Sequence, residues 1–244
     1  MVSWFDTLTT LNRLPAGAAL RLRHRGFDVL PGPVSGDHVQ ALTDAYTAAM
    51  SSATIADIRV GSTSTRVSDF VNRGEAFDPL YVFPPLLDAC CRVIGRPFKL
   101  SSLAARTLRP HSSAQELHVD VRPNSADCPI LGFILMVDEF RPENGATRFV
   151  PGSHEWLSAP EDTVGDVRAD YDGQVLACGH AGSLLVFDGS AWHGHTANRS
   201  DRPRRSIQGH FIPRDGQAAT DFAARMQPQT YARLSPLARY VLAL

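Results

Sequence analysis

From about Lys99 onward, the sequence consists of short apolar segments that are separated by turn residues. The segments are FKLSSLAARTL, AQELHVDV, ILGFILMVDEF, the stretch after Asn144-Gly145, AGSLLVFDGSAWHGHTA and RRSIQGHFIP. Asn-Gly between apolar runs is a strong signal for a β-hairpin. Several strands at such spacing, preceded by helices, predict a mainly β fold: a β-sandwich or jelly-roll barrel with helices packed outside.

The first third of the chain reads as mixed and partly helical. Residues 27–30 predict a short strand, and Ser35 is expected to cap a helix in which apolar residues repeat at helical spacing up to residue 50. A second helix is expected to begin at Pro84-Pro85 and to end at Gly95. Residues 58–78 lack clear periodicity and predict a long loop. Near the end of the chain, Ser235 predicts the cap of a short amphipathic helix.

A chain of 244 residues can bury one substantial core. We therefore expect a single domain, with a mainly helical flank over about 1–98, a jelly-roll core over about 99–215 and a C-terminal helical segment over about 216–244. A monomer or a homodimer is expected.

Composition and charge exclude several classes of protein. The formal net charge of -1 argues against a nucleic-acid partner. An apolar run of about 18 residues, which a membrane span would need, does not occur in the sequence. The N-terminus does not resemble a secretory signal, and the four cysteines form no CxxC pair. These features favour a cytoplasmic protein in a reducing compartment.

The stretch ELHVDVRP contains a histidine and an aspartate two positions apart. On a strand, His118 and Asp120 would point to the same side. A third ligand would come from a distant strand, where His193 and His195 are the candidates. Two imidazoles and one carboxylate that leave open positions are typical of non-haem iron(II) oxygenases. Because such a pair also occurs by chance as two solvated strand residues, the pair alone does not decide.

Downstream of these histidines, a cation and a hydroxyl occupy alternate positions. On a strand, Arg204 and Ser206 would share a face, and an arginine fork with a hydroxyl suits a carboxylate. The adjacent Arg205 would face away and be solvated.

These landmarks occur in the order that is typical of one enzyme family. The chain resembles the phytanoyl-CoA dioxygenase family of iron(II)/2-oxoglutarate-dependent oxygenases. The segments that carry the resemblance are GFDVLPGPVS, LLDACCRVIGRPFKL, QELHVD, ENGATRFVPGSH and GSLLVFDGSAWHGHTANRSDRPRRSI. The similarity runs from about Arg25 to the C-terminal helix.

The resemblance implies a double-stranded β-helix (a cupin-like jelly roll) and a set of site residues. It implies that Fe(II) is held by His118, Asp120 and His193, and that 2-oxoglutarate is bound by Arg204 and Ser206. His193 is favoured over His195 because the family's distal ligand is followed by glycine and by an Asn-x-Ser/Thr step before the arginine.

Two further residues have open alternatives. Gln115 matches a family position near the co-substrate or is a solvated strand residue. Thr107 would reach a co-substrate carboxylate or is an ordinary sheet-forming threonine, and the second interpretation is favoured.

The resemblance further implies oxidation of a C–H bond by O2, with succinate and carbon dioxide as co-products. Asp120 stands where related halogenases have a small residue, so hydroxylation or another oxidation is favoured over halogenation. The substrate is expected to be a small metabolite or a natural-product intermediate. The alternatives are a 2-oxoglutarate-dependent epimerase or cyclase on the same fold, a non-catalytic barrel that serves as a binding module, and a zinc hydrolase.

Substrate specificity is expected to lie on loops at the mouth of the barrel. The candidates are residues 59–77, the segment RPNSADCP and the segment EWLSAPEDTVGDVRADYDG. Within the first two, Arg66, Arg73 and Arg122 would either meet an anionic substrate or be solvated loop arginines, and the second interpretation is favoured.

Overall fold

The computed structural model describes residues 3–122 and 128–244, so that most of the segment RPNSADCP lies outside the described residues. Ten strands form two antiparallel sheets in these residues. The large sheet has the order β1-β8-β5-β10-β4-β3-β2, and the small sheet has the order β7-β6-β9. The prediction of a mainly β fold with flanking helices is confirmed.

The strands of the large sheet are β1 (Phe27–Leu30), β2 (Ile58–Val60), β3 (Ser64–Val67), β4 (Phe98–Leu108), β5 (Leu131–Met136), β8 (Leu184–Asp188) and β10 (Arg204–Pro213). Those of the small sheet are β6 (Thr147–Phe149), β7 (Val175–Ala177) and β9 (His193–His195). The helices are α1 (Trp4–Thr9), α2 (Ala18–Arg25), α3 (Val39–Ser51), α4 (Asp78–Tyr81), α5 (Pro84–Val93), α6 (Pro160–Thr163), α7 (Phe222–Arg225), α8 (Pro228–Arg233) and α9 (Pro236–Val241).

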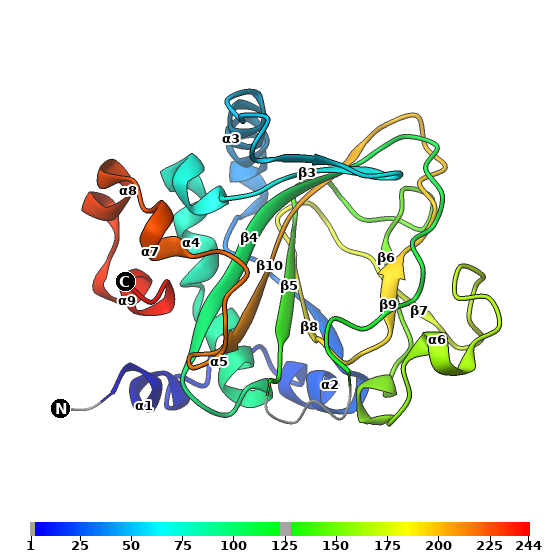
Figure 1. Ribbon diagram of the computed structural model, residues 1–244. Helices are drawn as coiled ribbons and strands as arrows, with labels where there is room; N and C mark the ends of the chain where they lie inside the picture. Colours follow the sequence, from blue (N-terminus) through cyan, green and yellow to red (C-terminus); the bar gives the residue numbers. More distant parts are fainter. Residues whose placement is uncertain (1–2, 123–127) are drawn as a thin grey trace.

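Each face of the large sheet is covered by a different layer. Helices pack on one face, and the small sheet lies on the other side (Figure 1). The main core fills the helical side, where Leu103, Phe133 and Ile207 of the sheet join apolar side chains of α3, α4, α5 and α9. A second cluster, which includes Met136 and Phe149, fills part of the space between the two sheets. The remaining space between the sheets is available for a site.

Strand β10 lies between β5 and β4 at the centre of the large sheet. Its side chains alternate, so that Ile207 and Phe211 enter the helical core while the polar residues point to the small sheet. The polar residues of this row are Arg204, Ser206, Gln208 and His210. Ser206 lies opposite Arg106 of β4 in the ladder. A polar stripe therefore runs along the inner face of the large sheet.

Two expectations about local structure are wrong. The segment 114–121 is not a regular strand; it contributes an isolated bridge between His118 and His193. Residues 58–78 do not form one long loop, because β2 and β3 extend the large sheet beyond β4 and two 3-10 turns, η2 (Phe70–Arg73) and η3 (Glu75–Phe77), follow. Pairing with β4, which is distant in sequence, stabilises β3, so local periodicity does not reveal this strand.

The expected boundaries of two helices, α5 and α9, agree with the structure. Helix α5 begins at Pro84, and Gly95 beyond its end has a φ of 69° in the left-handed region. The Ser235 side chain accepts a hydrogen bond from the Ala238 amide and caps α9. Ser35 instead precedes a 3-10 turn, η1 (Gly36–His38), and makes no side-chain cap. No helix in the described ranges is long and apolar enough to cross a membrane.

Candidate metal and co-substrate site

Three candidate ligands converge between the two sheets. His118 and Asp120 come from the connection between β4 and β5, and His193 begins β9. One ligand atom from each residue lies within 4.8 Å of the other two. Oδ2 of Asp120 is 3.7 Å from Nε2 of His193, and Oδ1 is 3.9 Å from Nε2 of His118. We call these residues the triad.

Backbone hydrogen bonds fix the triad although its first two members lie outside a regular strand. The amide of each histidine donates to the carbonyl of the other, at 2.9 and 3.0 Å. The amide of Asp120 donates to Gly189 O at 2.7 Å. This pairing gives the segment strand-like alternation, which is why His118 and Asp120 point the same way.

The tautomers of the two triad histidines are set by carbonyl acceptors. Nδ1 of His118 lies 3.0 Å from Glu116 O, and Nδ1 of His193 lies 2.9 Å from Ala191 O. A carbonyl can only accept, so the proton resides on Nδ1 and Nε2 keeps its lone pair. Both rings therefore offer Nε2 as a metal ligand.

The protonation states in the triad are those that a metal requires. Burial lowers the pKa of His193 to about 4, although Asp120 opposes this shift. Burial raises the pKa of Asp120, but at the low pH where this carboxyl would titrate, protonated His193 and a hydrogen bond from His210 outweigh burial and hold that pKa below its ordinary value. At neutral pH, Asp120 is a carboxylate and His193 a neutral imidazole, which is the ligating form of each.

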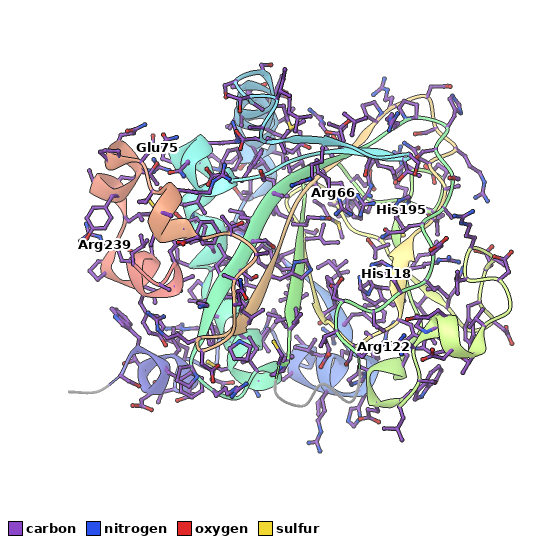
Figure 2. The ribbon with its side chains drawn as sticks, in the orientation of Figure 1. Arg66, Glu75, His118, Arg122, His195 and Arg239 are labelled. Carbon is purple, nitrogen blue, oxygen red and sulfur yellow. The ribbon has the colours of Figure 1, made fainter. Side chains whose placement is uncertain are left out.

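The triad opens into a cavity of about 340 Å³. Part of its wall is apolar and consists of Phe187 and Ile134. Its positive charge comes from Arg66, Arg106 and Arg204. Figure 2 shows Arg66 and His195 on the same side of His118, toward the end of the molecule that bears β3. The triad thus shares a cavity with cations that come from three strands of the large sheet.

Arg204 is a buried cation on β10. It is 2% exposed, its Nε has no hydrogen-bond partner in the described residues, and its guanidinium lies 4.1 Å from the centre of the Phe140 ring. Burial lowers its pKa to about 10, so that it is still charged at neutral pH. An unpaired buried charge is costly unless a ligand neutralises it. The residues present therefore fit an anion that reaches from the triad to Arg204.

Residues 22–206 match the phytanoyl-CoA dioxygenase (PhyH) family model. The chain belongs to this family.

Curated relatives of this family member are fungal dioxygenases. Dioxygenase cdmA of Talaromyces verruculosus is 36% identical over 120 residues, which are 43% of this chain and 39% of the relative. Dioxygenase aneA of Aspergillus aculeatus is 31% identical over 154 residues, which are 56% of this chain and 50% of the relative. The chain thus spans half or less of the length of these two relatives.

Solved structures with the same fold include the non-heme alpha ketoglutarate dependent carbocyclase SnoK from nogalamycin biosynthesis, with a TM-score of 0.67, 20% identity and coverage of 93% of both chains. EctD from S. alaskensis with bound Fe has a TM-score of 0.67, 18% identity and coverage of 83% of this chain and 78% of the other. At such identities the likeness shows the fold alone, which is the jelly roll predicted from the sequence.

His195, the other candidate ligand of this PhyH-family chain, lies outside the triad. Its Nδ1 donates to Thr196 O at 2.8 Å, and its Nε2 lies 3.4 Å from the Thr63 hydroxyl. The ring lines the cavity, and burial together with the charge of Arg106 lowers its pKa to about 3. His195 is therefore a neutral wall residue in this structure.

Two other predicted site residues, Gln115 and Ser206, lie in different surroundings. Gln115 lines the cavity, with its Nε2 atom 3.4 Å from Nε2 of His118. Ser206 is on the inner face, but its hydroxyl donates to the Arg106 carbonyl at 3.3 Å.

Thr107 corrects an expectation. Its hydroxyl lies 2.9 Å from that of Tyr46 on α3, and it faces Arg205 across the ladder on the outer side of the sheet. It does not line the cavity. The alternative interpretation, an ordinary sheet threonine, describes it better.

His210, which contacts the triad, was not singled out from the sequence. Its Nε2 donates to Oδ2 of Asp120 at 3.0 Å, and its Nδ1 lies 3.2 Å from the Ser102 hydroxyl. The signal was present in RRSIQGHFIP, where every second residue from Arg204 to His210 is polar. Extending the alternation by two steps beyond Ser206 would have placed His210 on the inner face.

Proposed function

We propose that this chain is an iron(II)/2-oxoglutarate-dependent oxygenase that oxidises a C–H bond of a small metabolite or natural-product intermediate. The observation that carries the proposal is the triad, whose three ligand atoms lie within 4.8 Å of one another in a cavity that Arg204 also lines. Arg204 is buried, and its Nε has no hydrogen-bond partner among the described residues. Two imidazoles and one carboxylate leave half of an octahedral coordination sphere open, which is the donor set of non-haem iron(II) oxygenases.

In this proposal, the metal is held by Nε2 of His118, Nε2 of His193 and the carboxylate of Asp120. Iron(II), 2-oxoglutarate and O2 together supply the oxidising chemistry, with succinate and carbon dioxide as co-products. Asp120 gives the iron a protein carboxylate, which favours oxidation over halogenation. His210 positions this carboxylate through its hydrogen bond to Oδ2.

Arg204 is proposed to bind the far carboxylate of 2-oxoglutarate. A dicarboxylate that binds the metal at one end would bring its other end to a buried guanidinium, which forms strong bidentate hydrogen bonds with carboxylates. Burial of Arg204 excludes competing water, and Phe140 holds its guanidinium plane. A zinc hydrolase would leave this buried arginine without a role.

The chain's apolar residues are proposed to shield the reacting centre. The Phe187 ring lies 4.7 Å from the ring of His193, and Phe149 stacks against the same imidazole at 5.6 Å. These rings hold the imidazole and keep water from one side of the metal position, while the cavity leaves room for a substrate on the other.

The test is a screen for succinate release with the iron-loaded protein, 2-oxoglutarate and a metabolite panel, followed by product analysis under isotopically labelled O2. The proposal predicts succinate and a product that has gained one labelled oxygen. A product of unchanged formula would assign an epimerase, and a product that has lost two hydrogens would assign a cyclase or desaturase. Succinate release no greater than in a chelator-treated control, for every compound, would contradict the proposal.

A further inference from the structure

Arg148 is a buried cation on the outer face of the small sheet. It lies in β6 between Thr147, which lines the metal cavity, and Phe149, which packs between the two sheets. Side chains alternate along a strand, so Arg148 points away from the cavity. It is nevertheless 0% exposed, because residues 164–174, which follow α6, cover this face of the sheet (Figure 1). We call residues 164–174 the covering segment.

The covering segment overlaps one of the stretches that the sequence suggests for substrate specificity, EWLSAPEDTVGDVRADYDG. None of its residues, all of which the structure describes, lines the metal cavity. Its apolar side chains pack instead against Leu117 and Trp192; they are Val164, Val167 and Tyr171. The segment therefore contacts the outer side of the chain that carries the triad.

The guanidinium of Arg148 joins the covering segment to the chain just before the triad. Its Nη2 donates to the Val167 carbonyl at 2.9 Å and to the Gln115 carbonyl at 3.0 Å. Its Nη1 donates to the Ala169 carbonyl and to Oε1 of Gln174, the latter at 3.3 Å. One rigid guanidinium thus binds two segments that are distant in sequence.

The same two segments also contact each other directly. The amide of Leu117 donates to the Val167 carbonyl at 2.8 Å. Arg168 forms a salt bridge with Glu116 at 2.8 Å, although an exposed pair of this kind contributes little. Hydrogen bonds to β9 occupy the other edge of the chain that leads to the triad. This chain is therefore held between β9 and the covering segment.

Gly194 leaves room for this close approach. It lies directly opposite Arg148 in the ladder of the small sheet, so both residues face the outer side. A Cβ at this position would lie 2.8 Å from Glu116 O and 3.3 Å from Gln115 O. The glycine between the two histidines of β9 thus admits the carbonyl that Arg148 binds.

Anchoring of a surface segment does not by itself account for the contacts of Arg148. Its hydrogen bonds to the covering segment would suffice for an anchor, whereas the bond to Gln115 reaches the chain that carries two of the three triad residues. Gln115 is three residues from His118, and Leu117 between them is bonded to the covering segment itself. A displacement of the covering segment would therefore move His118 and Asp120.

We propose that Arg148 is a positioning residue of the metal site, which sets the place of His118 and Asp120 by binding their chain to the covering segment. This inference rests on the proposed function, in which the triad holds the metal. Loss of a group that orients metal ligands typically lowers metal affinity about 10-fold to 100-fold. Because coupling between two sites is reciprocal, a bound metal must in turn stabilise the covering segment.

The first measurement is the affinity of the full chain for Co(II), determined by competition with a chelator of known affinity. Arg148→Met removes every hydrogen bond of the guanidinium and is expected to bind Co(II) about 10-fold to 100-fold more weakly than the wild-type protein. Arg148→Lys keeps the charge and a donor, and it is expected to recover part of the lost affinity.

Arg214→Met is the matched control. Arg214 also donates to a backbone carbonyl, that of Tyr240 at 2.7 Å, and its guanidinium lies over the ring of the same residue. Arg214 does not line the metal cavity, so this variant is expected to bind Co(II) as the wild-type protein does, even if its stability falls.

Hydrogen exchange of the wild-type protein is a second measurement, which does not depend on the folding of a variant. Exchange is followed by mass spectrometry with and without Co(II). Peptides from the covering segment are expected to exchange more slowly when Co(II) is bound, and by a larger factor than the peptide that contains α9.

The outcomes separate the two proposals. A wild-type protein that binds no Co(II) contradicts the proposed function and the inference with it. Normal binding by the wild-type protein and equal affinity in Arg148→Met overturn the inference alone. If Arg148→Met does not fold, hydrogen exchange decides: slower exchange in the covering segment than in α9 supports the inference, and an equal change in both, or none, overturns it.

Discussion

Nε2 of His210 lies 3.0 Å from Oδ2 of Asp120, so a histidine of the central strand β10 is tied to a carboxylate from the connection between β4 and β5. Hydrogen bonds of this kind orient metal ligands, and the loss of one typically lowers metal affinity about 10-fold to 100-fold. The relationship links the rigid centre of the large sheet to the most irregular part of the triad.

Replacing His210 is expected to weaken metal binding. His210→Phe leaves Asp120 without its donor, and metal affinity should fall about 10-fold to 100-fold, measured by competition with a chelator of known affinity. His111→Phe is the matched control, because His111 pairs with Asp201 at 2.9 Å on the surface. Equal affinities of the wild-type protein and His210→Phe would show that His210 does not position the carboxylate.

The two histidines of β9 should behave differently. His193→Gln removes a triad ligand and is expected to abolish stoichiometric binding of Fe(II) or Co(II) in equilibrium dialysis. His195→Gln is expected to keep that stoichiometry, because the His195 ring directs its Nδ1 to Thr196 O and its Nε2 to Thr63. The reverse pattern would identify His195 as the distal ligand.

Arg204 and its neighbour provide a second matched pair. Arg204→Met is expected to raise the KM for 2-oxoglutarate about 10-fold to 100-fold, because a charge-assisted hydrogen bond in a buried site is lost. Arg205→Met should change this KM little, since Arg205 binds Asp138 through Nε at 3.0 Å and Nη2 at 2.7 Å on the outer face. An equal rise in both variants would contradict the assignment of Arg204.

Stability of the metal-free protein should fall in mild acid because of His195. The pKa of this imidazole is about 3 in the folded protein, below its ordinary value of 6.5. Between these two pH values, His195 is protonated in the unfolded chain but neutral in the folded protein. The stability that the neutral imidazole allows is therefore present above pH 6.5 and is lost as the pH falls toward 3. Between pH 7 and pH 5 the loss is about 2 kcal/mol for this histidine.

Urea unfolding at several pH values measures this effect. His195→Gln should lose about 2 kcal/mol less than the wild-type protein over the same interval. The remaining titrating groups are common to both proteins and cancel in the comparison. Parallel pH profiles for the two proteins would mean that His195 is not held neutral by its surroundings.

Much of the fold could be predicted because its signals are local. Strand β10 and helix α5 stand between clear turn or cap residues, and the spacing of His118 and Asp120 puts both on one side once the segment is extended. The motifs of the family, in their order along the chain, predicted the jelly roll. They also predicted that the triad residues, which are distant in sequence, form one site.

What could not be predicted depends on register across strands. Strand β4 is covered on both faces, so its sequence does not alternate and gave no sign that Arg106 faces inward and Thr107 outward. Strand β3 exists because it pairs with β4, so the register that places Arg66 opposite Arg106 could not be predicted from the sequence of either strand. His210 was missed for a different reason, because its alternation was readable but was not followed far enough.

Anaerobic titration with iron(II) and 2-oxoglutarate shows whether His118, Asp120 and His193 hold iron beside a site for 2-oxoglutarate. We expect a visible charge-transfer band that saturates at one iron and one 2-oxoglutarate per chain and is absent in Asp120→Ala. A wild-type protein that develops no band, or an Asp120→Ala variant that develops the same band, would contradict this assignment.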